Sequence, residues 1–154
     1  MKRNLLLVLC SAFALSMNAK IVYVTSTGSA GNDGSSWDKA VDNITTAMTK
    51  VTAGDEIWMA KGTYVISEKL VLADYVDIYG GFAGTETSVD QRVREDESKP
   101  WSFVNETILT GNGGNYRLTD VNKGFERTEV AYFDGLTVSG HATNDDKILS
   151  LIHI

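Results

Sequence analysis

Short runs that alternate apolar, mostly β-branched or aromatic residues with polar ones recur along the chain. The first covers residues 21–25, and four later ones, each ending on glycine, cover residues 57–62, 76–80, 107–111 and 136–140. Runs of this length that are bounded by turn residues predict strands. A strand and turn that recur every 20–30 residues favour a solenoid, in which each coil buries its inner face against its neighbours. A β-sandwich with evenly spaced strands is the alternative.

One segment near the N-terminus has a helical period instead. Apolar residues recur at i, i+3, i+4 and i+7 over residues 36–52. Ser35 stands three residues before Asp38, as in a capping box, and Gly54 follows the last apolar position. The pattern predicts an amphipathic helix over residues 36–52.

The first nineteen residues have the layout of a secretory signal. Lys2 and Arg3 precede an uncharged apolar run over residues 5–15, and Ala19 provides a small residue for cleavage. The run is too short to span a membrane, so we predict a cleaved signal peptide and a secreted or outer-cell-surface protein. Cleavage would remove two positive charges and Cys10, the only cysteine, and would change the net charge from −6 to −8. The mature chain would then use neither disulfides nor a thiolate metal site.

Charge narrows the class of partner. The chain has a net charge of −6 and a sequence pI of about 4.8. A binder of nucleic acid or of an anionic membrane normally carries a basic patch, so neither partner is expected. The oligomeric state is left open.

Several motifs together resemble a known family. They are Asn-Asp-Gly-Ser-Ser-Trp at residues 32–37, Gly-Asp-Glu-Ile-Trp-Met-Ala-Lys-Gly-Thr-Tyr at 54–64, and Gly-Gly-Phe-Ala-Gly-Thr-Glu-Thr-Ser at 80–88 followed by Gln91 and Arg92. With these motifs, residues 21–140 resemble the N-terminal portion of secreted bacterial right-handed parallel β-helix proteins. These belong to the pectate-lyase-like superfamily and include relatives of polymorphic outer-membrane proteins. The resemblance implies an all-β fold, a single-stranded right-handed parallel β-helix with an N-terminal capping α-helix.

The resemblance also suggests how the chain is divided. Residues 1–19 are the signal peptide, residues 20–54 hold the first strand, a loop and the capping helix, and residues 55–148 form the first coils. An amphipathic helix at this place would cover strand edges that are otherwise open to association. We expect residues 149–154, Leu-Ser-Leu-Ile-His-Ile, to be an assembly artefact, because a common sequencing adaptor translates to the same residues. The natural chain would then continue through further coils.

A charged segment over residues 84–105 holds the candidate site residues. The candidate ligand-contact loop consists of Arg92, Arg94, Glu95, Asp96, Lys99 and Trp101. Lyases of the superfamily combine acidic Ca²⁺ ligands with an Arg or Lys base, which implies contact with an anionic sugar or Ca²⁺. The interspersed charges also fit a solvated loop packed by Trp101, which is the interpretation we favour. Because no acidic cluster recurs at one strand position, the sequence indicates no catalytic residue, no metal ligand and no cofactor, and Ca²⁺ remains only an option for a longer chain.

Aromatic residues offer a second route to sugar binding. Tyr64, Tyr79, Trp58 and Trp101 would form a stacking strip if exposed, although core packing is the favoured interpretation. Two functions follow from these observations. The preferred one is an exported, non-catalytic, adhesin-like scaffold that binds polysaccharide or cell-surface glycan. The other is the leading part of a polysaccharide lyase or glycoside hydrolase whose active groove lies on later coils, so the sequence leaves open whether the protein is an enzyme.

Overall fold

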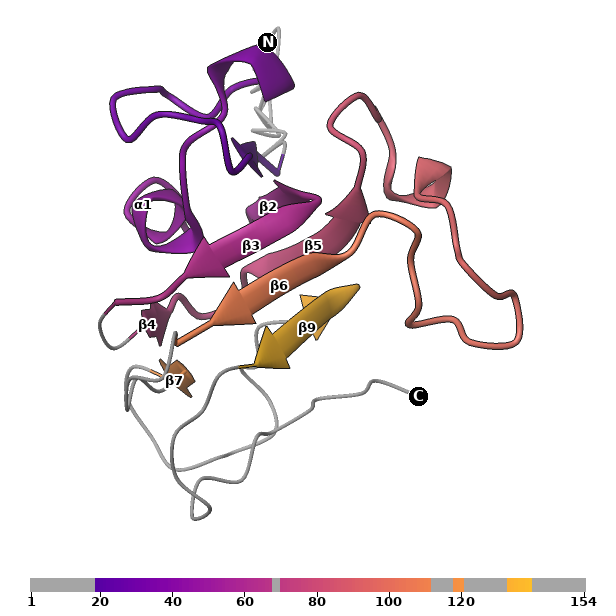
Figure 1. Ribbon diagram of the computed structural model, residues 1–154. Coiled ribbons are helices and arrows are strands. Elements are labelled where there is room, and N and C mark those ends of the chain that lie inside the picture. Colours follow the sequence, from indigo (N-terminus) through magenta and orange to yellow (C-terminus); the bar gives the residue numbers. More distant parts are fainter. Residues whose placement is uncertain (1–18, 68–69, 112–117, 121–132, 140–154) are drawn as a thin grey trace, which may run out of the picture.

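Parallel pairing of short strands organises the chain (Figure 1). The computed structural model describes residues 19–67, 70–111, 118–120 and 133–139. The predicted signal peptide up to residue 18 and the predicted artefact at 149–154 therefore lie outside the described residues. The strands are β1 (Ile21–Val24), β2 (Glu56–Ala60), β3 (Gly62–Val65), β4 (Leu70–Leu72), β5 (Asp77–Phe82), β6 (Thr107–Thr110), β7 (Leu118–Asp120), β8 (Phe133–Asp134) and β9 (Leu136–Ser139).

The strands belong to three sheets. Sheet A has the order β1-β2-β5-β8, sheet B has the order β3-β6-β9, and sheet C pairs β4 with β7. Strands that follow one another along the chain after β1 lie in different sheets, so every pair within a sheet is joined by a crossover, as parallel pairing requires. The corners are tight where β2 passes into β3 at Lys61 and where β8 passes into β9 at Gly135.

The predicted fold class is wrong. The sequence predicts an all-β right-handed parallel β-helix, whereas the described residues form three small parallel sheets with short helices and no closed solenoid. The fold is a small mixed α/β fold. The physical reason lies in the connections, which range from the single residue Lys61 to the segment 83–106 between β5 and β6. Segments of such unequal length fold into local structures of their own and do not form a series of equal coils.

The predicted helix over residues 36–52 is also wrong in extent. A short 3₁₀ helix covers Trp37–Lys39, and α1 covers only Ile44–Met48. Between them the backbone is extended at Val41, whose N–H donates to the carbonyl of Tyr23 at 2.9 Å. This long-range pairing with β1 interrupts a segment whose β-branched residues give it weak helix propensity. The side chain of Asn43 caps α1 by accepting from the N–H of Thr46 at 2.8 Å.

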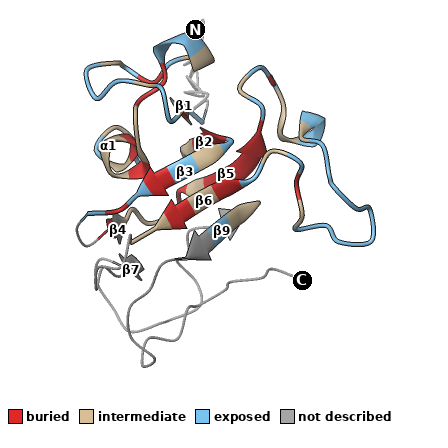
Figure 2. Cartoon of the chain, in the orientation of Figure 1, coloured by how far each residue is buried: buried red, intermediate tan, exposed pale blue. Residues whose placement is uncertain are grey.

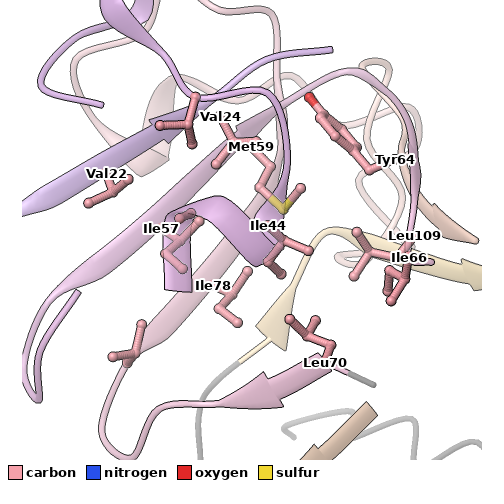
Figure 3. Close-up of a cluster of buried hydrophobic side chains, with 13 residues drawn as sticks. Val22, Val24, Ile44, Ile57, Met59, Tyr64, Ile66, Leu70, Ile78 and Leu109 are labelled. Atoms are coloured by element: carbon pink, nitrogen blue, oxygen red, sulfur yellow. The ribbon is translucent and has the colours of Figure 1, made fainter. Parts of the chain in front are cut away.

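The core lies between the inner faces of the sheets and α1 (Figure 3). Successive residues of a strand point to opposite faces, and in sheet A the register aligns Val22, Ile57 and Ile78 on the inner face. Val24 and Met59 of sheet A join them, and side chains from sheets B and C and from α1 complete this apolar cluster, including Tyr64, Leu70, Leu109 and Ile44. Since β1 and α1 pack into the same cluster as the later strands, residues 20–54 share one core with the strands that follow.

Candidate functional site

Aromatic side chains cover the outer face of sheet A. The strand register places Tyr23, Trp58 and Tyr79 side by side on β1, β2 and β5. Next to Trp58 the register shifts, so that Gly80 and Gly81 form a bulge and Phe82 returns to the same face. The ring of Phe82 stacks on Trp58 with centroids 4.7 Å apart and planes 13° apart. These contacts make the outer face of sheet A a second apolar layer.

Arg92 lies in this layer rather than on the surface. Its guanidinium is 4.4 Å from the ring centroid of Phe103 and 5.5 Å from that of Tyr79. Its Nη2 donates to Asp134 Oδ2 at 2.7 Å, and Nη1 donates to the carbonyl of Gly80 at 2.9 Å. The side chain is only 7% exposed. The charge and the donors of Arg92 are therefore used within the fold.

The segment that follows Arg92 is an antiparallel hairpin, here called the 93–104 hairpin. The N–H of Val104 donates to the carbonyl of Val93, and the N–H of Glu95 donates to the carbonyl of Ser102, each at 2.9 Å. At the tip, Lys99 N–H donates to the carbonyl of Asp96. The hairpin extends away from the sheets and is mostly exposed (Figure 2).

Phe103 anchors the hairpin to sheet A. It pairs across the hairpin with Arg94, and its side chain is 8% exposed. The ring lies against the backbone of Gly81 and Gly135, which both have positive φ, and a Cβ built on Gly81 would be 2.7 Å from Phe103 Cγ. Glycine at these positions allows both the backbone conformation and the close approach of the ring. The base of the hairpin is therefore held by Phe103 together with Arg92.

The hairpin presents apolar side chains to solvent. Val93, Trp101 and Val104 are 56%, 62% and 60% exposed, respectively. By contrast, Trp58 and Tyr64 are buried. Of the four aromatic residues that the sequence offers for sugar stacking, Trp101 is the one whose ring the structure places in the open on an anchored support.

The structure brings together five of the six residues of the predicted ligand-contact loop. Arg94, Glu95, Asp96, Lys99 and Trp101 lie on the 93–104 hairpin, whereas Arg92 lies beneath its base. Arg94 pairs with Glu97, and Lys99 pairs with Asp96, each at 3.8 Å. The Ser102 hydroxyl donates to Glu95 Oε2 at 2.8 Å. The hydroxyl and the N–H of Ser98 both bond to Asp96 and hold the pKa of this carboxyl below its ordinary value.

A buried carboxylate supports the loop that leads to the hairpin. Glu86 is 8% exposed and accepts from the N–H of Ala83 at 2.7 Å and from the N–H groups of Gly84 and Thr85 at 2.9 Å. Burial raises the pKa of Glu86, but the backbone N–H donors outweigh this effect and hold the pKa below its ordinary value. The Glu86 carbonyl accepts from the indole N–H of Trp37 at 2.8 Å. Glu86 therefore connects the loop at residues 83–85 to Trp37, which packs against the aromatic layer.

Replacing Glu86 with glutamine tests this role through pH. Because the folded-state pKa lies below the unfolded value of about 4.3, the carboxylate stabilises the fold at neutral pH, and this contribution is lost as the pH falls through the folded pKa. We expect Glu86→Gln to cost about 2 kcal/mol at pH 7 and less at low pH. Urea denaturation between about pH 3 and 7 measures both effects. Glu97→Gln, at a side chain that is 88% exposed, is the control and should change little, and equal pH slopes for wild type and Glu86→Gln would contradict the assignment.

Three residues that build the site were not among the residues predicted from the sequence. Phe103 and Asp134 carry no motif signal, because their partners lie on other elements. Glu86 lies in the motif at 80–88, but the motif does not indicate that its carboxylate accepts from the N–H groups of the preceding residues. The paired glycines at 80 and 81 next to Phe82 were the one available clue, since consecutive glycines in a strand indicate a bulge or a close approach.

The described residues offer neither a metal site nor a membrane-spanning helix. Among these residues there is no cluster of three or more His, Cys, Asp or Glu side chains suited to a metal ion. In the same residues no helix has the length and apolar character needed to cross a bilayer. Comparison with known proteins finds no matching family, no matching curated protein and no matching solved structure.

Proposed function

We propose that this chain is an exported binding module that holds a polysaccharide or cell-surface glycan against the 93–104 hairpin. The observation that carries the proposal is Trp101, a residue that is 62% exposed on a hairpin whose base is fixed to sheet A. An indole ring offers an apolar face with negative charge density, which suits the C–H face of a sugar ring. The secretory pattern of residues 1–19 is consistent with a ligand outside the cell.

Anchoring of the hairpin supports a binding role. Phe103 and Arg92 are nearly buried at its base, and cross-strand hydrogen bonds fix the strands on both sides. A preorganised support lowers the entropy lost on binding, and an aromatic side chain with two rotatable bonds loses little itself. The Glu95 carboxylate and the Ser102 hydroxyl, which are bonded to each other next to Trp101 in the hairpin, would bond to sugar hydroxyls.

Removal of the Trp101 ring should abolish most of the binding. We expect Trp101→Ala to weaken polysaccharide binding about tenfold or more, as expected for an aromatic side chain at the centre of a contact. The purified chain is titrated by calorimetry with hydroxyethylcellulose, galactomannan, xylan and homogalacturonan. Trp101→Phe, which keeps an aromatic face, should retain measurable affinity.

A matched control is available at the other end of the sheets. Tyr75 is 52% exposed and lies on the segment between β4 and β5, before β5 begins, whereas the hairpin follows the end of β5. Tyr75→Ala should bind as the wild type does. Binding that is unchanged in Trp101→Ala, or a wild-type chain that binds none of the polymers, would contradict the proposed function.

A further inference from the structure

The charges of the hairpin allow the class of glycan to be named, on the assumption that the proposed function holds. The segment 92–104 contains three cations and three acids. An acidic polysaccharide needs a cation that is free to meet its carboxylates, because Arg and Lys are the side chains that recognise this group. Whether each cation of the segment is free or already paired with a carboxylate therefore decides between an acidic and a neutral ligand.

Each of the three cations already has a carboxylate partner. Arg92 is bound to Asp134 at 2.7 Å and is nearly buried. Arg94 faces Glu97, and Lys99 faces Asp96, each at 3.8 Å on the surface. Exposed pairs of this length add little to stability, but each places a negative charge where a uronate carboxylate would have to bind. The hydroxyl and the N–H of Ser98 bond to Asp96 and hold this carboxylate beside Lys99.

The remaining charge on the hairpin is negative. With Arg92 matched by Asp134, the hairpin itself carries two cations, Arg94 and Lys99, and three acids. The third acid, Glu95, has the Ser102 hydroxyl as its partner on the hairpin. The whole chain, with a net charge of −6, repels a polyanion at longer range. Carboxylates are acceptors, and the hydroxyl groups of a neutral sugar are donors that they can use.

From this arrangement we infer that the hairpin binds a neutral polysaccharide and discriminates against an acidic one. Trp101 supplies the stacking face, and the exposed carboxylate of Glu95, which is bonded across the hairpin to Ser102 next to Trp101, accepts from sugar hydroxyls. Because no charge pair forms across the contact, affinity depends little on salt. This ligand class differs from the anionic sugar that the sequence resemblance implies.

A polymer with switchable charge tests the inference directly. Homogalacturonan is prepared fully methyl-esterified, which is neutral, and fully de-esterified, which is acidic, so that the two forms share one backbone. Hydroxyethylcellulose and galactomannan are added as further neutral polymers. Affinity is measured by calorimetry at about 20 mM and about 500 mM NaCl, which spans weak to strong screening. We expect a neutral polymer to bind at least about tenfold more tightly than the de-esterified form at low salt, with less than about a twofold change in its affinity between the salts.

The variant Glu97→Gln is expected to gain affinity for the acidic polymer. Its side chain is 88% exposed, so the substitution should leave the fold intact while it frees Arg94. We expect binding of the de-esterified polymer to rise about two- to fivefold, the range expected for one exposed charge, with binding of the neutral polymer nearly unchanged. Val65→Gln, at an exposed position on β3, is the control and should change neither affinity.

The possible outcomes distinguish a failure of the neutral ligand class from a failure of the proposed glycan-binding function. If the de-esterified form binds as tightly as the neutral polymers or more tightly, and Trp101→Ala abolishes that binding, the neutral class is overturned while the proposed function stands. If no polymer binds at either salt concentration, the proposed function fails and the inference fails with it. Neutral binding that depends on Trp101 and is insensitive to salt supports both.

Discussion

A methyl group at Gly80 is expected to destabilise the protein by about 3 kcal/mol or more, because it collides with backbone that has no room to move. A Cβ built on Gly80 would lie 2.3 Å from the carbonyl oxygen of Gly135, 2.7 Å from Leu136 Cδ2 and 2.9 Å from Thr107 Cβ. Rotation of a side chain cannot relieve the first contact. Gly80→Ala would therefore separate β5 from the corner between β8 and β9.

Urea denaturation followed by tryptophan fluorescence measures this effect, since Trp58 is buried next to the bulge and becomes exposed on unfolding. Gly31→Ala is the matched control. A Cβ on Gly31 would meet only Ser29 Oγ, at 3.8 Å, so this variant should be as stable as the wild type or more stable by up to about 1 kcal/mol. Similar denaturation midpoints for the two variants would refute the packing described at Gly80.

Truncation of Arg92 is expected to cost about 3–5 kcal/mol, as is usual when one partner of a buried ion pair is removed. Arg92→Ala removes the bond to Asp134, the donor to the Gly80 carbonyl and the cation that lies over Phe103. Arg92→Lys should recover only part of the loss, because an ammonium group lacks the planar fork that makes these contacts together.

Arg94 provides the control, two residues further along the chain. Its pair with Glu97 is exposed and 3.8 Å long, so Arg94→Ala should change stability by less than about 1 kcal/mol. A double-mutant cycle of Arg92→Ala and Asp134→Ala should give a coupling energy of about 1–3 kcal/mol. A coupling energy near zero would show that the pair at 2.7 Å does not act as a unit.

The strands that bury alternate residues could be predicted from the sequence. Residues 21–25, 57–62, 76–80, 107–111 and 136–140 overlap β1, β2, β5, β6 and β9, because apolar alternation reports directly on a buried face. The run predicted over residues 57–62 ends at Gly62, whereas β2 ends at Ala60 and Gly62 begins β3 in another sheet, so the corner at Lys61 was missed. Sequence spacing also does not fix whether recurring strands close into a solenoid, and this is why the fold class was wrong.

The stretch of sequence that forms the candidate site could be predicted, but the contacts of its side chains could not. The structure places Arg94, Glu95, Asp96 and Lys99 on one hairpin and Arg92 beneath its base, and the role of these residues in ligand contact stays a prediction. Which of them is free depends on partners distant in the sequence, and no local pattern reveals that Asp134 binds Arg92 or that two glycines accommodate Phe103. Exposure of Trp101 likewise follows from the path of the hairpin and not from its composition.

The bond between Arg92 and Asp134 also affects the order in which parts of the protein can fold during synthesis. The two residues are 42 positions apart, and the chain emerges from synthesis N-terminus first. β1, β2 and β5 can pair before residues 133–135 exist, but the base of the hairpin has no complete support until β8 arrives. The 93–104 hairpin is therefore among the last parts of the described fold to take its final form, and a chain interrupted before residue 133 would carry the whole hairpin without the partner that orients it.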